Sequence, residues 1–165
     1  MIAAYVIIAL VALQRLIELA YARSNARYLL ANGGVELGAR HYPLLILLHT
    51  GWLAAMALFV PRNLLVNWWL IGVFVLLQLA RIWAIRSLGP YWTTRIISVP
   101  AVALVRRGPY RFVRHPNYIV VVGEIAILPL ALGEPIVALV FTLLNAGVLA
   151  IRLRVEEQAL AQREL

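Results

Sequence analysis

The stretch Tyr118–Ile151, YIVVVGEIAILPLALGEPIVALVFTLLNAGVLAI, decides the fold of this 165-residue chain. Glu124 and Glu134 are its only charged residues, and Gly133-Glu134-Pro135 divides it into two apolar runs. Glycine and proline interrupt regular structure, so this tripeptide predicts a tight turn. A helix that crosses a bilayer needs about 20 mainly apolar residues. The stretch therefore predicts a helical hairpin inside a membrane.

Apolar runs of similar length precede the hairpin. They predict three N-terminal spans within residues 1–86, at Ile2–Ala22, Pro43–Val60 and Leu64–Ile85, before the hairpin spans Tyr118–Leu132 and Pro135–Ile151. The fourth run is short for a span, so we expect it to lie partly within the protein or to cross a thinned region. The expected fold is all-α, a polytopic membrane bundle of about five transmembrane helices in a single domain over residues 1–165.

The composition supports a membrane protein. The mean hydropathy is +0.88 and 13% of the residues are charged, whereas about a quarter are charged in soluble domains. Cysteine is absent, which excludes disulfides, thiolate metal sites and cysteine nucleophiles. No metal-binding spacing such as HExxH occurs, so we predict no metal site.

The charges indicate orientation. All fifteen cationic residues are arginines, and the net charge is +8. Such a charge can indicate nucleic-acid binding, but the arginines stand at the ends of apolar runs, as the positive-inside rule expects, and we predict no nucleic-acid partner. They crowd the first and third connections and the C-terminal tail. We therefore expect an inner-membrane protein of bacterial type, with its N-terminus outside and its C-terminus in the cytosol.

One long connection does not span the membrane. It runs from Ser87 to Asn117 and contains several glycine and proline breakers, yet it is too apolar for a disordered linker. A long irregular segment in a compact domain is usually functional. We expect this cytosolic loop to fold against the mouth of the bundle, with the hairpin and a C-terminal helix at Arg152–Leu165 completing residues 87–165.

Polar residues within the apolar runs are costly and are usually paired or functional. Gln14, Arg15 and Glu18 share one helix face. They form either a network that fixes helix packing or, through Glu18, part of a substrate cavity. Glu124 is alone in the fourth run, where Arg81 or Arg15 could pair with it; structural pairing and a role in substrate binding both remain open.

Two histidines lie around the start of the second run. His41 is followed by Tyr42, and His49 lies about two helical turns after His41. Their spacing matches no metal motif. We interpret them as hydrogen-bonded histidines near the membrane interface.

The segment RRGPYRFVRHPNY, Arg106–Tyr118, concentrates arginines and aromatic residues before the fourth run. An arginine belt facing anionic headgroups would explain the cations. It would not explain His115, Tyr110 or Tyr118. Because the fourth and fifth runs form a hairpin, this segment should meet Arg152 and Glu156, which are spaced one helical turn apart. The sequence thus predicts a pocket at the membrane–cytosol boundary.

GPYRFVRHPNY, then the hairpin, then RLRVEEQAL from Arg152, resembles the isoprenylcysteine carboxyl methyltransferase family. These are integral membrane enzymes that use S-adenosylmethionine. The resemblance covers about half the chain, from Leu88 onward, and WTTR at Trp92–Arg95 is similar to short bacterial members. It implies a cofactor pocket and a methyl acceptor held by Arg152.

The resemblance and the chemistry together give a set of site residues. Arg152 is the predicted catalytic residue and also binds substrate, with Glu124 and Glu18 as further substrate-binding candidates. The arginines of the loop suit the carboxylate of the cofactor, and aromatic faces suit its sulfonium. The predicted cofactor-binding residues are Val102, Leu104, Val105, Tyr110, Arg114, His115, Tyr118 and Glu156.

The predicted reaction is methyl transfer to a carboxylate or an acidic hydroxyl of a lipophilic substrate. An isoprenylcysteine-like molecule, a fatty carboxylate or a long-chain alkylpyrone fits, and such acceptors need no strong base. One alternative is an NADPH-dependent membrane reductase of the sterol type, because those enzymes carry a motif like PNY before a hairpin. Another is a lipid-binding or scaffold protein without enzymatic activity.

Overall fold

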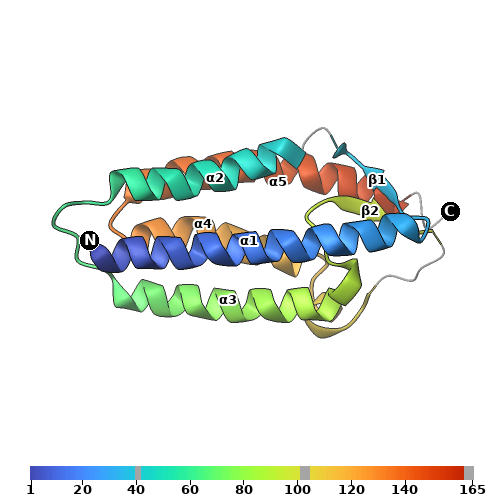
Figure 1. The fold of residues 1–165 in the computed structure, drawn as a ribbon, viewed down its shortest axis with the longest axis horizontal. Coiled ribbons are helices and arrows are strands. Elements are labelled where there is room, and N and C mark those ends of the chain that lie inside the picture. Colours follow the sequence, from blue (N-terminus) through green and yellow to red (C-terminus); the bar gives the residue numbers. More distant parts are fainter. Residues whose placement is uncertain (40–41, 101–104, 162–165) are drawn as a thin grey trace.

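The computed structural model describes residues 1–39, 42–100 and 105–161, and this part of the chain contains five α-helices aligned along one long axis (Figure 1). The N-terminus and the α4–α5 turn lie at one end of the bundle, and two short strands and the end of α5 lie at the other. The helices are α1 (Ile2–Ala31), α2 (Tyr42–Phe59), α3 (Trp68–Leu88), α4 (Pro116–Ala131) and α5 (Pro135–Ala161).

Four of these helices, α1, α2, α3 and α5, are long and apolar enough to cross a membrane, whereas α4 is an apolar helix of only 16 residues. Large apolar side chains cover the outside of the bundle; Leu65, Trp69 and Ile136 are more than three-quarters exposed. Such a surface suits lipid rather than water. The predicted all-α membrane bundle with a short fourth segment is confirmed.

Helix α4 is short because protein surrounds much of it. Its buried residues include Ile125, Leu128 and Pro129. Ile125 and Leu128 pack in the core with Trp52 and Met56 of α2. Helix α4 passes behind α1, between α3 on one side and α2 and α5 on the other (Figure 1). A helix enclosed by other helices does not need the full length of a lipid-facing span.

Three helix boundaries differ from the sequence prediction by four residues or more. Helix α1 continues past Ala22 to Ala31, because the first breaker is the Asn32-Gly33 turn, where Gly33 has φ +84°. Helix α3 begins at Trp68 rather than Leu64, because the Asn67 side chain caps it by accepting a hydrogen bond from Leu70 N at 3.2 Å. Helix α5 continues to Ala161, so the predicted C-terminal helix is an extension of the fifth span.

A two-stranded antiparallel sheet was not predicted. Strand β1 (Val35–Leu37) pairs with β2 (Ile96–Ser98), with Glu36 opposite Ile97. The sheet joins the first connection to the long loop, and Arg95 Nη1 pairs with Glu36 Oε2 at 2.9 Å beside it. The loop also contains two short 3₁₀ helices, η2 (Gly89–Tyr91) and η3 (Gly108–Arg111). The described part of the loop thus folds against the bundle, as expected.

Glu124 lies at the centre of a buried polar network that joins three helices. Its carboxylate pairs with Arg15 of α1 at 3.0 Å and with Arg81 of α3 at 3.1 Å, and it accepts a hydrogen bond from Gln78 at 2.7 Å. The side chain of Glu124 is 3% exposed. Both arginines suggested by the sequence therefore reach it.

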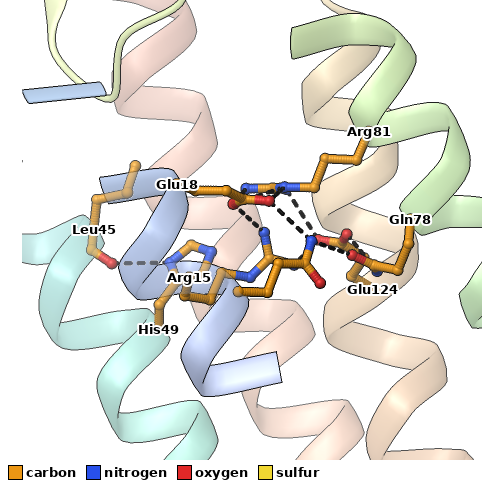
Figure 2. Close-up of polar contacts among 8 residues, drawn as sticks. Arg15, Glu18, Leu45, His49, Gln78, Arg81 and Glu124 are labelled. Atoms are coloured by element: carbon orange, nitrogen blue, oxygen red, sulfur yellow. Dashed lines mark hydrogen bonds and ion pairs between the residues drawn. The ribbon is translucent and has the colours of Figure 1, made fainter. Parts of the chain in front are cut away.

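A second carboxylate completes the four-charge network of Arg15, Glu18, Arg81 and Glu124 (Figure 2). Arg81 donates to Glu18 through Nε and Nη2, both at 2.8 Å to the nearer oxygen, and Arg15 pairs with Glu18 at 2.7 Å. Two arginines thus balance two glutamates. The expectation that Glu18 belongs to a packing network is confirmed.

Removing one charge from this network should destabilise the bundle. Glu124→Gln leaves two buried arginines facing one carboxylate, which should lower the free energy of unfolding by about 3 kcal/mol or more. The matched control is Glu36→Gln, which breaks the more exposed pair with Arg95 and should cost about 0–1 kcal/mol. Thermal unfolding in one detergent measures both. Equal losses in the two variants would contradict a structural role for the network.

Glu134, in the turn before α5, is 5% exposed, and neither of its carboxylate oxygens has a hydrogen-bond partner among the described residues. Burial penalises the charged form. It raises the pKa of Glu134 from 4.5 to about 7. Between pH 4.5 and about pH 7, the Glu134 carboxyl is therefore mainly protonated in the folded protein and mainly ionised in the unfolded chain.

This difference predicts a pH-dependent stability. Because the folded pKa exceeds the unfolded value, the contribution of Glu134 is most favourable below pH 4.5, declines as the pH rises and is lost above about pH 7. The melting temperature of the wild type should fall over this interval, and Glu134→Gln should remove that part of the decline. Melting curves between pH 4 and about 8 provide the measurement. A decline of the same size in Glu134→Gln would show that Glu134 does not cause this pH dependence.

Candidate functional site

Four side chains meet where α4 begins and α5 leaves the bundle: His115, Tyr118, Arg152 and Glu156. We call them the Tyr118 cluster. The Tyr118 hydroxyl accepts a hydrogen bond from Arg152 Nε at 2.6 Å and donates one to Glu156. The His115 ring stacks on the Tyr118 ring with centroids 5.2 Å apart, and its Nδ1 lies 3.7 Å from Glu156 Oε1. The predicted meeting of the Arg106–Tyr118 segment with Arg152 and Glu156 is present in the structure.

The local sequence explains this convergence. Pro116 occupies the first turn of α4, where a missing N–H costs nothing, and His115 is the residue before the helix. Tyr118 therefore projects from the first turn. Arg152 and Glu156 follow each other at i and i+4 on α5, so they share one face. The tight α4–α5 turn makes the helices antiparallel neighbours and brings these ends together.

Arg152 is held by the protein on more than one side. Its Nη1 donates to the carbonyl oxygen of Thr94 at 2.7 Å, and its guanidinium lies 5.7 Å from the centre of the Tyr118 ring. Arg152 is 7% exposed, yet it forms no ion pair with a carboxylate in the described ranges. A fixed cation without an anion is suited to binding an anionic group from outside the chain.

The loop that presents Thr94 is itself anchored. Trp92 is buried and stacks on Tyr21 of α1, with ring centroids 5.8 Å apart. Asn25 of α1 donates from Nδ2 to the Trp92 carbonyl at 2.8 Å and to the Gly89 carbonyl at 3.2 Å. These contacts fix the carbonyl that orients Arg152.

A cavity of about 60 Å³ lies between the Tyr118 cluster and the four-charge network. Tyr118 and Arg152 line the cavity on the side of the Tyr118 cluster. Arg81, from the network, and His49 also line it. His49 Nδ1 donates to the Leu45 carbonyl at 2.9 Å, the bond drawn in Figure 2. The prediction of a hydrogen-bonded His49 is confirmed, whereas His41 lies outside the described residues.

A separate groove of about 580 Å³ runs between α1 and α3. Apolar side chains such as Leu13 and Ile82 line it, together with Gln14, Glu18 and Gln78 of the polar network. Glu18 therefore lines a groove, as its substrate-binding prediction requires. Glu124 lies deeper, among its arginine partners, and a substrate contact for either glutamate stays a prediction.

The remaining predicted cofactor residues are spread along the loop. Tyr110 lies in η3, where burial and the nearby Glu156 carboxylate raise its pKa above the ordinary tyrosine value. Arg114 is exposed and makes no hydrogen bond or ion pair with a described residue, and Val105 is half-buried. Val102 and Leu104 lie outside the described residues.

Sequence reasoning missed four polar residues that line the cavity. They are Thr93, Thr94, Asn117 and Asn145. Thr94 acts through its carbonyl, which no side-chain pattern reveals. Asn145 could have been found from the sequence, because it is a lone amide in an apolar run. It lies seven residues before Arg152, about two turns away on the same helix face.

A family model described as the isoprenylcysteine carboxyl methyltransferase family matches residues 70–162, more than half of the chain. The match contains the whole Tyr118 cluster. The chain belongs to this family. Membership implies methyltransferase activity in a membrane protein, and it agrees with the apolar helices of the bundle.

The curated relatives have no assigned function. The chain is 38% identical to the uncharacterized protein YpbQ of Bacillus subtilis, over 96% of each chain. It is 29% identical to an uncharacterized Haemophilus influenzae protein, over 89% of this chain and 88% of the other. No solved structure matches it.

The η3 turn that carries Tyr110 should depend on Gly108. Gly108 and Gly89 both have φ +57°, which disfavours alanine by about 1–2 kcal/mol. A Cβ at Gly108 would also lie 2.0 Å from Ser87 Oγ, whereas the nearest atom at Gly89 is Arg107 Nη2 at 3.7 Å. Gly108→Ala should therefore lower the melting temperature more than Gly89→Ala. Adding Ser87→Gly should recover part of the difference; no recovery would contradict the clash.

Proposed function

We propose that this protein is an S-adenosylmethionine-dependent O-methyltransferase. Its acceptor is a carboxylate or acidic hydroxyl of a lipophilic molecule, such as an isoprenylcysteine-like compound, a long-chain lipid or an alkylpyrone. The observation that carries the proposal is Arg152, a fixed cation without an anionic partner among the described residues, beside an interior cavity and the rings of the Tyr118 cluster. Family membership supplies the reaction class.

The residues of the Tyr118 cluster fit the cofactor. Glu156 is 29% exposed at its side chain, so its carboxylate is accessible to the ammonium group of the amino acid part. The stacked rings of His115 and Tyr118 offer π faces to a cation. The bound cofactor supplies an electrophilic methyl group on a sulfonium sulfur. Exposed Arg114 lies on the same loop and can meet the cofactor carboxylate.

Arg152 holds the acceptor oxygen in this proposal. Thr94 and Tyr118 fix the guanidinium through Nη1 and Nε, which leaves Nη2 to donate to a ligand. Methyl transfer between two bound groups gains most from orientation in line. An ionised carboxylate or enolate is already a nucleophile, so the arginine need only position it. Such a reaction requires no cysteine, lysine or aspartate, which this chain lacks.

The lipophilic part of the acceptor would enter from the bilayer. The outer surface of the bundle is apolar, so an alkyl or isoprenyl chain can stay in the lipid beside it while the head group reaches the site. The arginine distribution favours a Tyr118 cluster on the cytosolic side, with the N-terminus outside, as in a bacterial inner membrane. The cofactor would then reach the cluster from the cytosol.

Two substitutions separate the proposed roles. Glu156→Ala should weaken S-adenosylmethionine binding at least tenfold, because it removes a charged hydrogen-bond acceptor. Arg152→Ala should lower turnover more than cofactor affinity. Glu157→Ala is the matched control, since Glu157 is an exposed neighbour. Calorimetry in detergent gives the affinities, and transfer of a labelled methyl group to extracted lipids gives the turnover.

The wild type should bind S-adenosylmethionine at micromolar concentration and NADPH negligibly. The reverse preference would replace the proposal with the membrane reductase. Wild-type cofactor affinity in Glu156→Ala would remove that residue from the cofactor site and leave the reaction class standing. Mass spectrometry of the labelled lipids identifies the acceptor.

A further inference from the structure

Asn145, in the middle of α5, is a buried amide without a partner. It is 2% exposed, and its Nδ2 makes no hydrogen bond to any described residue. The same side chain lines the cavity between the Tyr118 cluster and the four-charge network. An unpaired buried donor costs about 1–3 kcal/mol. Leucine, of similar size, would avoid that cost, so an amide at this position is suited to a partner from outside the chain.

The other cavity residues define the chemistry of that partner. Arg81 and Arg152 are the charged side chains that line the cavity, and no glutamate lines it within the described ranges. Arg81 is occupied by Glu18 and Glu124, whereas Arg152 has no carboxylate partner there. An amide donor beside a guanidinium without a carboxylate partner favours an electron-rich oxygen group, and the unpaired Oδ1 of Asn117, which also lines the cavity, can accept a hydrogen bond from water there.

Asn145 and Arg152 both face this cavity from one helix. They are seven residues apart, which is about two turns, so they lie on one face. Long side chains on a helix lean toward its N-terminus, which brings the Arg152 head toward Asn145. The two donors can thus contact different oxygens of one small head group, with Arg152 nearer to Tyr118.

We infer that Asn145 is a specificity-determining residue that binds the second, non-reacting oxygen of the methyl acceptor. The acceptor head therefore carries two oxygens, as a carboxylate or an enolate conjugated to a carbonyl does. In the transfer, the first oxygen forms the new C–O bond and the C–S bond of the sulfonium breaks, with its electron pair passing to sulfur. The second oxygen stays hydrogen-bonded to the Asn145 amide. This inference rests on the proposed function.

The test uses Asn145→Leu in the full-length protein with two classes of acceptor. The two-oxygen probes are 4-dodecylbenzoate and a 4-hydroxy-6-undecyl-2-pyrone, and the one-oxygen probe is 4-dodecyl-2,3,5,6-tetrafluorophenol, a phenol whose fluorine atoms make the hydroxyl acidic enough to ionise at neutral pH. For the two-oxygen probes, kcat/KM should fall by about 10- to 100-fold, the effect of losing one hydrogen bond to a charged group. For the phenol it should change less than about threefold.

A second readout separates recognition from a structural role. Because leucine removes an unpaired donor, Asn145→Leu should melt at the wild-type temperature or above it, with unchanged S-adenosylmethionine affinity. The matched control is Thr142→Val, one turn away on α5 and outside the cavity lining. It should alter neither kcat/KM nor the ratio between probes.

Several outcomes would overturn the inference. An equal loss of kcat/KM for both acceptor classes, or no loss for either, would mean that the amide binds only ordered water and not the acceptor. A clearly lower melting temperature would make Asn145 structural. A wild type that binds the cofactor but methylates only the phenol would exclude a two-oxygen head. Failure of the wild type to bind S-adenosylmethionine would instead refute the proposed function, and this inference with it.

Discussion

The bundle depends on the burial of Glu124 against two arginines. A carboxylate in an apolar helix is tolerated only when its charge is compensated and its oxygens are hydrogen-bonded. Arg15 and Arg81 provide the charge and Gln78 provides a further donor, from two helices that share little other packing. The pairing fixes α1 and α3 around α4 at one level along the axis. The cavity and the Tyr118 cluster then take their positions from α4.

Apolar periodicity and breakers in the sequence were sufficient to predict the helices, because burial in lipid leaves few alternatives to a helix. The Tyr118–Glu156 contact was also predictable, since a tight turn fixes which ends of two helices are neighbours. The extension of α1 and the β1–β2 sheet were not. Polar helix ends and three-residue strands depend on contacts between distant segments, which carry little local signal.

The residues of the candidate site show the same division. Arg152 and Glu156 were predictable because they are spaced one helical turn apart at the end of the hairpin and match the motif of the family. The Thr94 carbonyl that orients Arg152 is invisible in the sequence, because any residue there would supply it. Asn145 is an intermediate case: an amide in an apolar run is unusual, but only the fold shows that it faces a cavity rather than another helix.

Helix α5 has a further consequence through its length. At 27 residues it extends about 40 Å, against about 30 Å for the hydrocarbon core of a typical bilayer. Asn145 and Glu156 are rigidly spaced along it, so one lies at the depth of the acyl chains when the other lies among the headgroups. A thicker or thinner membrane would tilt this helix and move both together. In the proposed function, the lipid composition of the host membrane would thereby set how far a substrate must rise from the bilayer to react.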